Sequence, residues 1–208
     1  MTTKLGLISD VHASLAPLNE ALTIFRREKV DKIICAGDIA GYFEELEPSI
    51  DLLCEYECTT IIGNHDQAWL EEHADQEETR SYRFLSSLPA TREYRIEGKY
   101  VYVVHAHPPA SQHGGIKLLD VDGKLISAQK EYWHRELELV NVDVLIVGHT
   151  HQVFVEQLGQ VLVINPGSTQ FNHTCMILTL PDMSVEIYAL EGKEPLKSWN
   201  WGKFVHNQ

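Results

Sequence analysis

The sequence is poor in basic residues, and this shortage limits the partners that the protein can bind. Seventeen lysine and arginine residues stand against thirty aspartate and glutamate residues, which gives a formal net charge of −13 at pH 7. An acidic surface repels polyanions, whereas extended nucleic acid binds to clustered lysine and arginine side chains. The composition therefore disfavours extended nucleic acid as a partner, although a local basic patch stays open.

Paired cysteines are also absent from the sequence. Cys35, Cys54, Cys58 and Cys175 form no C-x-x-C pair and no zinc-ribbon spacing, and three of the four lie in apolar segments. These features argue against a structural zinc site built on cysteine. Reduced and mostly buried thiols are therefore expected.

A long apolar run is missing as well. No apolar stretch reaches the roughly 18 residues that a membrane-spanning helix needs, and the chain enters its first predicted strand at about Leu5 with no signal peptide before it. We therefore expect a cytoplasmic protein without a membrane partner. Whether the chain forms a homodimer stays open.

The apolar residues that are present recur with the periods of an α/β protein. Apolar runs and alternation predict strands over 5–9, 32–35, 59–62, 94–96, 100–104, 144–147, 154–158, 161–164, 175–180 and 185–189. Helical spacing predicts helices over 15–25, 46–56, 68–70, 82–88 and 133–140. The βαβαβ order at the start favours a mostly parallel sheet.

A chain of 208 residues buries a substantial core. We expect one domain over 1–190 and a C-terminal tail over 191–208, whose Trp199 and Trp201 pack on the body or on a partner.

Five of the predicted strands end in side chains that bind metal ions. These ends are Ser9-Asp10-Val11-His12, Gly37-Asp38, Gly63-Asn64-His65-Asp66, Val104-His105 and Gly148-His149-Thr150-His151. In open α/β sheets ligands bind at the carboxyl ends of the strands. Asp10 and His12 are two residues apart, so on an extended strand end both point to one side and can chelate one ion. Seven oxygen and nitrogen ligands without a thiolate suit two divalent ions of the Mn, Fe, Zn or Ni kind.

A purely structural explanation competes with metal binding at each position taken alone. Asp10 or Asp38 by itself is explained as a carboxylate that caps a loop or helix, and a single histidine as a hydrogen-bonded core residue. Five coincidences at strand ends favour the metal site instead. Asp66 is different, because it precedes a predicted helix and is a good N-cap; we expect it to cap that helix.

The five strand ends, in this order, resemble the calcineurin-like metallophosphoesterases. Their spacing and the stretch 37–42 are most similar to the small bacterial and archaeal phosphodiesterase branch. The resemblance implies an αββα sandwich of two mixed β-sheets flanked by helices, with a dinuclear metal site at the C-terminal ends of the strands. It implies that one ion, manganese being favoured, is held by Asp10, His12, Asp38 and His151. The second ion would be held by Asp38, Asn64, His105 and His149, with Asp38 bridging the two.

The implied function is metal-dependent hydrolysis of a P–O bond in a small phosphate ester, with a phosphodiester as the preferred substrate. Two ions lower the pKa of a bound water, so that hydroxide attacks phosphorus in line. The resemblance makes His65 the catalytic, non-ligand histidine, which stabilises the transition state or protonates the leaving group. Three alternatives stay open: a monoester phosphatase, a non-catalytic metal-binding scaffold of the same fold, and a nuclease. A basic groove leading to His65 would favour the nuclease.

Several loops around the expected site shape access to it. The stretch 106–124 is rich in proline and glycine and has no periodicity, so we expect a substrate-facing lid. Within it, His107 and the glycine-flanked His113 are assigned to loop structure rather than to metal binding. The stretch 165–168, Asn-Pro-Gly-Ser, follows a strand and is expected to be a structural turn beneath the site. The sequence departs from the family that it resembles at Ala13-Ser14, Phe43 and Ala106, which puts the substrate and access to the site, rather than the ligand set, in question.

Overall fold

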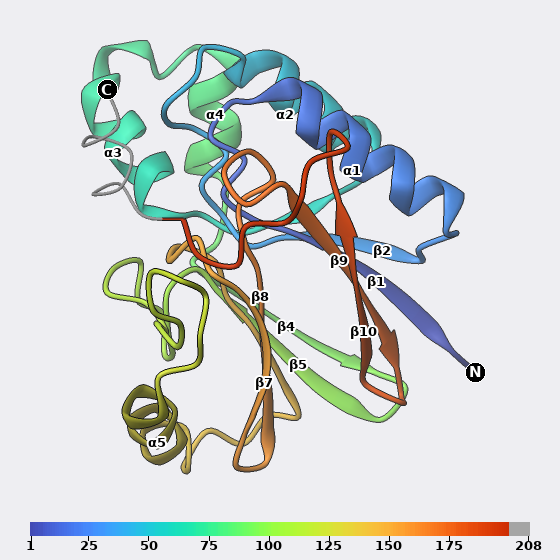
Figure 1. Ribbon diagram of the computed structural model, residues 1–208. Helices are drawn as coiled ribbons and strands as arrows, with labels where there is room; N and C mark the ends of the chain where they lie inside the picture. Colours follow the sequence, from blue (N-terminus) through green and yellow to red (C-terminus); the bar gives the residue numbers. More distant parts are fainter. Residues whose placement is uncertain (200–208) are drawn as a thin grey trace.

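A computed structural model of the protein describes residues 1–199 and places their strands in two five-stranded sheets (Figure 1). The strands are β1 Thr3–Ile8, β2 Lys32–Cys35, β3 Thr59–Thr60, β4 Thr91–Ile96, β5 Lys99–Val104, β6 Val144–Ile146, β7 Val153–Leu158, β8 Val161–Pro166, β9 Thr174–Leu180 and β10 Ser184–Ala189. The helices are α1 Leu15–Arg27, α2 Leu46–Glu55, α3 Asn64–Glu72, α4 Arg80–Ser86 and α5 Ser127–Glu136, with a 3-10 turn at Ala74–Gln76.

Both sheets are mixed, as expected. The first has the strand order β10-β9-β1-β2-β3, in which β1, β2 and β3 are parallel and β9 and β10 are antiparallel to their neighbours. The second has the order β4-β5-β6-β8-β7, with a parallel centre of β5, β6 and β8. Because α1 and α2 connect the parallel strands of the first sheet, those strands deliver their carboxyl ends to one edge.

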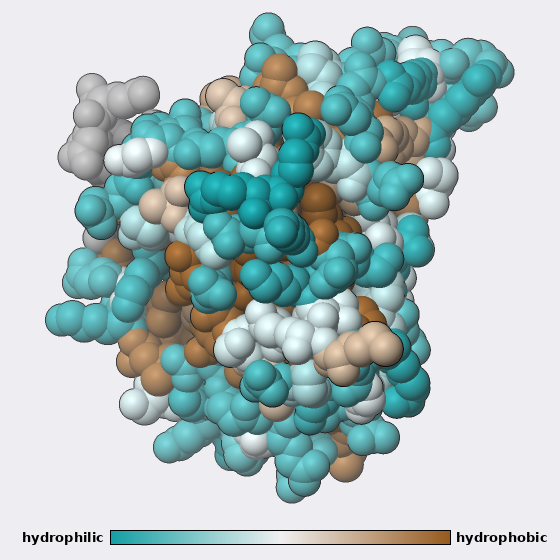
Figure 2. Space-filling model, turned by 90° about the vertical axis from the view of Figure 1, so that its right-hand side faces the viewer, coloured by the Kyte–Doolittle hydropathy of each residue, from teal (hydrophilic) through white to brown (hydrophobic). Residues whose placement is uncertain are grey.

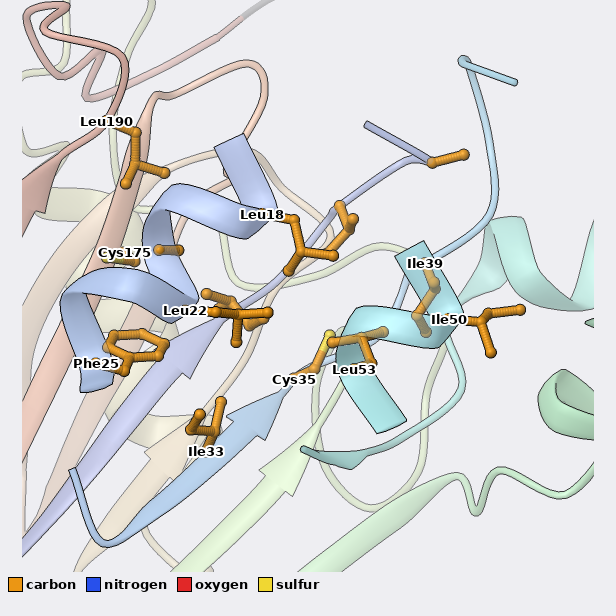
Figure 3. Close-up of a cluster of buried hydrophobic side chains, with 14 of the residues drawn as sticks. Leu18, Leu22, Phe25, Ile33, Cys35, Ile39, Ile50, Leu53, Cys175 and Leu190 are labelled. Carbon is orange, nitrogen blue, oxygen red and sulfur yellow. The ribbon is translucent and has the colours of Figure 1, made fainter. Parts of the chain in front are cut away.

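The layers follow from the two-residue period of the strands. Leu5 and Leu7 of β1 face the second sheet, whereas Ile8 belongs to the cluster beneath α1 and α2. Figure 3 shows this outer cluster, where Phe25 of α1 lies over the sheet. A Cβ on Gly6 would lie 2.8 Å from the ring of Phe25, so the glycine lets α1 pack this close. The expected sandwich of two sheets flanked by helices is therefore confirmed.

The outer face of the second sheet is covered by α5 and by part of the stretch expected to be a lid. Ile116 and Leu118 are fully buried in a cluster with residues of β5, β6 and β8. The Gln152 side-chain oxygen accepts hydrogen bonds from the backbone N–H groups of Leu118 and Leu119, at 2.8 and 3.0 Å. Ile116, Leu118 and Leu119 are thus part of the core, which contradicts a lid at these three residues; the role of the rest of 106–124 stays a prediction.

The open edge between the two sheets is apolar. Val155 of β7 and Val185 of β10, which lie on edge strands of the two sheets, are partly buried against the inter-sheet cluster. Figure 2 shows hydrophobic residues in the middle of one side of the molecule, between more hydrophilic parts above and below. No helix within residues 1–199 is long and apolar enough to span a membrane.

Some predicted boundaries differ from those of the structure. Ladder pairing of β3 covers only Thr59–Thr60. The helix α5 ends at Glu136, so Leu137 lies in the turn after it and Val140 lies beyond that turn. Trp201 lies outside the described residues, and the division into a domain over 1–190 and a tail stays a prediction. Residues up to 199 of that tail lie beside the candidate site described next.

Candidate metal centre

The first group of candidate ligands comes from the ends of β1 and β6. Asp10, His12 and His151 are buried, and the Nε2 atoms of the two histidines are 2.9 Å apart. Asp10 Oδ1 lies 3.4 Å from His151 Nε2 and 3.9 Å from His12 Nε2. One carboxylate oxygen and two ring nitrogens therefore face a common point and can hold one metal ion.

The second group joins the ends of four segments. Asp38 Oδ2 lies 3.2 Å from His105 Nε2. The side-chain oxygen of Asn64 lies 3.0 Å from His105 Nε2 and 2.8 Å from His149 Nδ1. Asp38, His105 and His149 together can hold a second ion, with the Asn64 oxygen directed at the same histidines.

The backbone that carries these side chains is strained. Asp10, His12, Asp38, His149 and His151 all have positive φ angles, from 47° to 65°. Non-glycine residues in this region cost free energy and concentrate at functional sites. The left-handed backbone at these residues directs their side chains toward the two ligand groups. The extended strand end expected for Asp10 and His12 is wrong, because β1 stops at Ile8 and both residues have positive φ angles, although their side chains face one group as expected.

Hydrogen bonds to the backbone orient two of the imidazole rings. His105 Nδ1 lies 2.7 Å from the Ala36 carbonyl oxygen, and His12 Nδ1 lies 3.3 Å from that of Ala40. A carbonyl oxygen only accepts, so Nδ1 is the donor in both rings and Nε2 faces the centre. An imidazole held in this way is typical of metal-binding histidines.

Burial sets the charge of the site. It lowers the pKa of His12 and of His149 to about 4 each, so both rings are neutral at pH 7, the form that binds metal ions. Burial also lowers the pKa of His105, but the Asp38 carboxylate outweighs it and raises that pKa to about 9. Burial by itself raises the pKa of Asp10. The hydrogen bond to His151 and the charge of that ring outweigh burial, so the pKa lies below its usual value. Buried, ionised carboxylates such as Asp10 and Asp38, which lie beside imidazole rings, are suited to binding a divalent cation.

His65 lies at the rim of the centre, on the first turn of α3. Its backbone N–H donates to Asp38 Oδ1 at 2.8 Å, and its Nε2 lies 3.2 Å from the Tyr42 hydroxyl. Its ring is 4.9 Å from that of His12, edge to face. His65 also lies close enough to His12 and Asp38 to form a third possible ligand group.

Asp66 has a larger structural role than the sequence suggested. It is not the N-cap of α3 but its third residue, and it is fully buried. Its carboxylate accepts four backbone N–H bonds, from Gly63, Asp38, Ile39 and Ala40, at 2.8 to 3.0 Å. Burial and the Asp38 charge raise the pKa of Asp66 to about 7. The N–H bonds to its two oxygens favour the ionised form and so limit this rise of the pKa.

The turn at 165–168 lies beneath the site, as expected. Ser168 Oγ donates to the Asp10 carbonyl oxygen at 2.6 Å, and Asn165 Nδ2 donates to the Gly148 carbonyl oxygen at 2.9 Å. The turn therefore fixes the backbone at two of the strand ends, and Ser168 is a structural residue.

The C-terminal segment runs along the site. Val153 N–H donates to the Lys197 carbonyl oxygen at 2.8 Å, and Trp199 N–H donates to that of His151 at 3.1 Å. The Trp199 ring lies 4.2 Å from that of Phe171, stacked, and 5.3 Å from that of His151. Of the two positions left open for the tail, residues up to 199 take the one on the body. The alternating pattern that identifies strands gave no signal for this segment.

A cavity of about 630 Å³ opens beside the centre and is lined by Asp38, His65, His149 and His151 at the metal end. Among the described residues, Lys117 is the only lysine or arginine that lines it. Within residues 1–199 the cavity that His65 lines therefore carries a single basic side chain, and the expectation that the protein is not a nuclease stays a prediction.

Comparison with known proteins shows the family and the fold. The family model of the calcineurin-like phosphoesterase superfamily domain matches residues 3–182. The phosphodiesterase MJ0936 of Methanocaldococcus jannaschii is 27% identical over 173 residues, 79% of this chain and 82% of that protein. The crystal structure of hypothetical protein PH1004 from Pyrococcus horikoshii has a TM-score of 0.73 at 16% identity, covering 99% of this chain and 91% of the other. A structure of an archaeal phosphodiesterase has a TM-score of 0.60 at 23% identity, covering 90% and 100%.

Proposed function

This chain belongs to the calcineurin-like phosphoesterase superfamily, and from that premise we propose that it is a metal-dependent phosphodiesterase acting on a small phosphate ester. The observation that carries the proposal is the pair of ligand groups that meet at one edge of the sandwich, with His65 beside them. A scaffold has no need of a complete ligand set on strained backbone.

Asp10, His12 and His151 would hold one ion and Asn64, His105 and His149 the other, and Asp38 would be shared by both. Asp38 belongs to possible ligand groups with His12 and with His105, which supports the bridge. Manganese is favoured over iron, zinc and nickel. Bound ions would draw in the anionic phosphate and make a water molecule more acidic.

The protein's own groups then complete the chemistry. The Asp38 carboxylate holds the backbone of His65, and the Tyr42 hydroxyl contacts its ring. The ring is half-buried at the cavity wall. We assign it to donate a hydrogen bond or a proton to the oxygen that leaves phosphorus. Support for a diester substrate comes from the relative MJ0936, whose name is phosphodiesterase.

The test compares initial rates of Mn²⁺-reconstituted protein on bis(p-nitrophenyl) phosphate and on p-nitrophenyl phosphate, with chelator-stripped protein as control. The proposal predicts metal-dependent turnover that is faster on the diester. Faster turnover of the monoester would make the protein a phosphatase. No turnover of either compound by metal-loaded protein would favour a scaffold.

A further inference from the structure

The cavity beside the metal centre is larger than a phosphate group requires. Its volume of about 630 Å³ lies in the range of pockets that enclose an entire small organic ligand. The candidate ligands and His65 form only one end of it. The remaining wall comes from the segment 117–126 and from the C-terminal segment, so a second part of the substrate has a place to bind.

Apolar side chains form much of that remaining wall. Leu119 is almost fully buried, whereas Ile126 is 36% exposed, and both line the cavity. Trp199 lines it as well. Large apolar side chains gathered at the surface beside a binding site mark a region that an apolar group covers.

Lys117 adds a positive charge to the same wall. It is exposed and is the one basic side chain among the described residues of the lining, which also includes Asp120. It follows Ile116, whose carbonyl oxygen accepts a hydrogen bond from the Thr150 hydroxyl at 3.3 Å. Thr150 stands between His149 and His151 in the chain, so Lys117 is anchored next to the centre. An available cation in a protein with net charge −13 is suited to an anionic group of the substrate.

We propose that the substrate is a phosphate diester with a hydrophobic, ring-sized arm that carries a second negative charge. The arm lies against Leu119 and Ile126, and its charge pairs with Lys117. This inference rests on the proposed function, because it names the substrate class of the same site. Lys117 and Ile126 are then specificity-determining residues outside the metal centre.

Three diesters with the same p-nitrophenolate leaving group test the inference, since only the retained arm differs. The arms are methyl, phenyl and 4-carboxyphenyl. Burial of the ring predicts a kcat/KM for the phenyl ester at least about tenfold above that of the methyl ester. For the 4-carboxyphenyl ester, pairing of the carboxylate with Lys117 predicts a kcat/KM about two- to fivefold above that of the phenyl ester. This gain should fall as salt is added.

Two pairs of variants, each with one residue in the cavity lining and one outside it, test whether the gains in kcat/KM depend on the cavity wall. Lys117→Met abolishes the gain from the carboxylate, whereas Lys124→Met, an exposed lysine of the same segment that does not line the cavity, retains it. Ile126→Ser reduces the advantage of the phenyl ester, whereas Leu125→Ser, 40% exposed and outside the lining, leaves it intact. The two control variants, Lys124→Met and Leu125→Ser, leave the rate on the methyl ester unchanged.

Equal kcat/KM values for the methyl and phenyl esters, with both hydrolysed in a metal-dependent manner, would overturn the inference and leave the proposed function standing. A carboxylate gain that survives Lys117→Met would overturn the assignment of Lys117. Failure of metal-loaded protein to hydrolyse any of the three diesters would overturn the proposed function, and this inference with it.

Discussion

Replacing Asp66 by asparagine is expected to destabilise the protein although one oxygen of the side chain is kept. One carboxylate oxygen accepts N–H bonds from Asp38 and Gly63, and the other accepts them from Ile39 and Ala40. An asparagine presents an oxygen to only one of these pairs. In either orientation of the amide, two buried N–H groups face its NH₂ group and lose their acceptor.

The magnitude follows from the two lost bonds. A hydrogen bond to a charged group contributes roughly 1.5–3 kcal/mol, and a buried donor without an acceptor costs about 1–3 kcal/mol. Because relaxation recovers part of this, we expect Asp66→Asn to lower the free energy of unfolding by about 3 kcal/mol. For a chain of this length that corresponds to a Tm lower by about 6–12 °C.

The assay is thermal and urea unfolding of the metal-free protein, so that metal binding does not contribute. Asp75→Asn is the matched control, because Asp75 is exposed in the 3-10 turn after α3, and its Tm should equal that of the wild type. If Asp66→Asn also unfolds at the wild-type temperature, the four N–H bonds do not hold the Asp38 loop as described.

Two further predictions address the site loop and the thiols. Gly41→Ala should reduce metal content without unfolding the chain, as measured by mass spectrometry of bound metal and by circular dichroism, because Gly41 has a φ of 137° and a Cβ there would lie 2.6 Å from His12 Nδ1. A thiol reagent at pH 8 should label Cys54 first, as peptide mapping checks, because Cys54 is exposed whereas burial raises the pKa of Cys58 to about 12 and that of Cys35 well above its usual value.

Short-range patterns in the sequence predicted the sheets and the candidate ligands that the fold brings together. Apolar runs located the strands, because buried strands must be apolar whichever neighbours they pair with. The polar residues that follow them, such as Asp10 and His105, were found for the same reason: a polar group directly after a buried strand stands out. The comparisons confirm the family that these stretches indicated.

Features fixed by tertiary contacts were not predictable from the pattern. Asp66 precedes an apolar helical segment whether it is an N-cap or a buried acceptor, and only the approach of the Asp38 loop decides between the two. The segment 116–119 carries no period of its own, because its burial depends on Gln152, which is distant in the sequence. The left-handed backbone at His149 and His151 is likewise set by the centre that they form.

The central claim is that seven side chains hold two ions and that His65 acts on the substrate without being a ligand. Metal stoichiometry of Mn²⁺-reconstituted protein, measured by mass spectrometry beside the rate on bis(p-nitrophenyl) phosphate, tests it most directly. We predict two ions per chain in the wild type and in His65→Ala, with most turnover lost in the variant, and fewer than two ions in Asp38→Asn. Two ions retained in Asp38→Asn, or full activity in His65→Ala, would contradict the account.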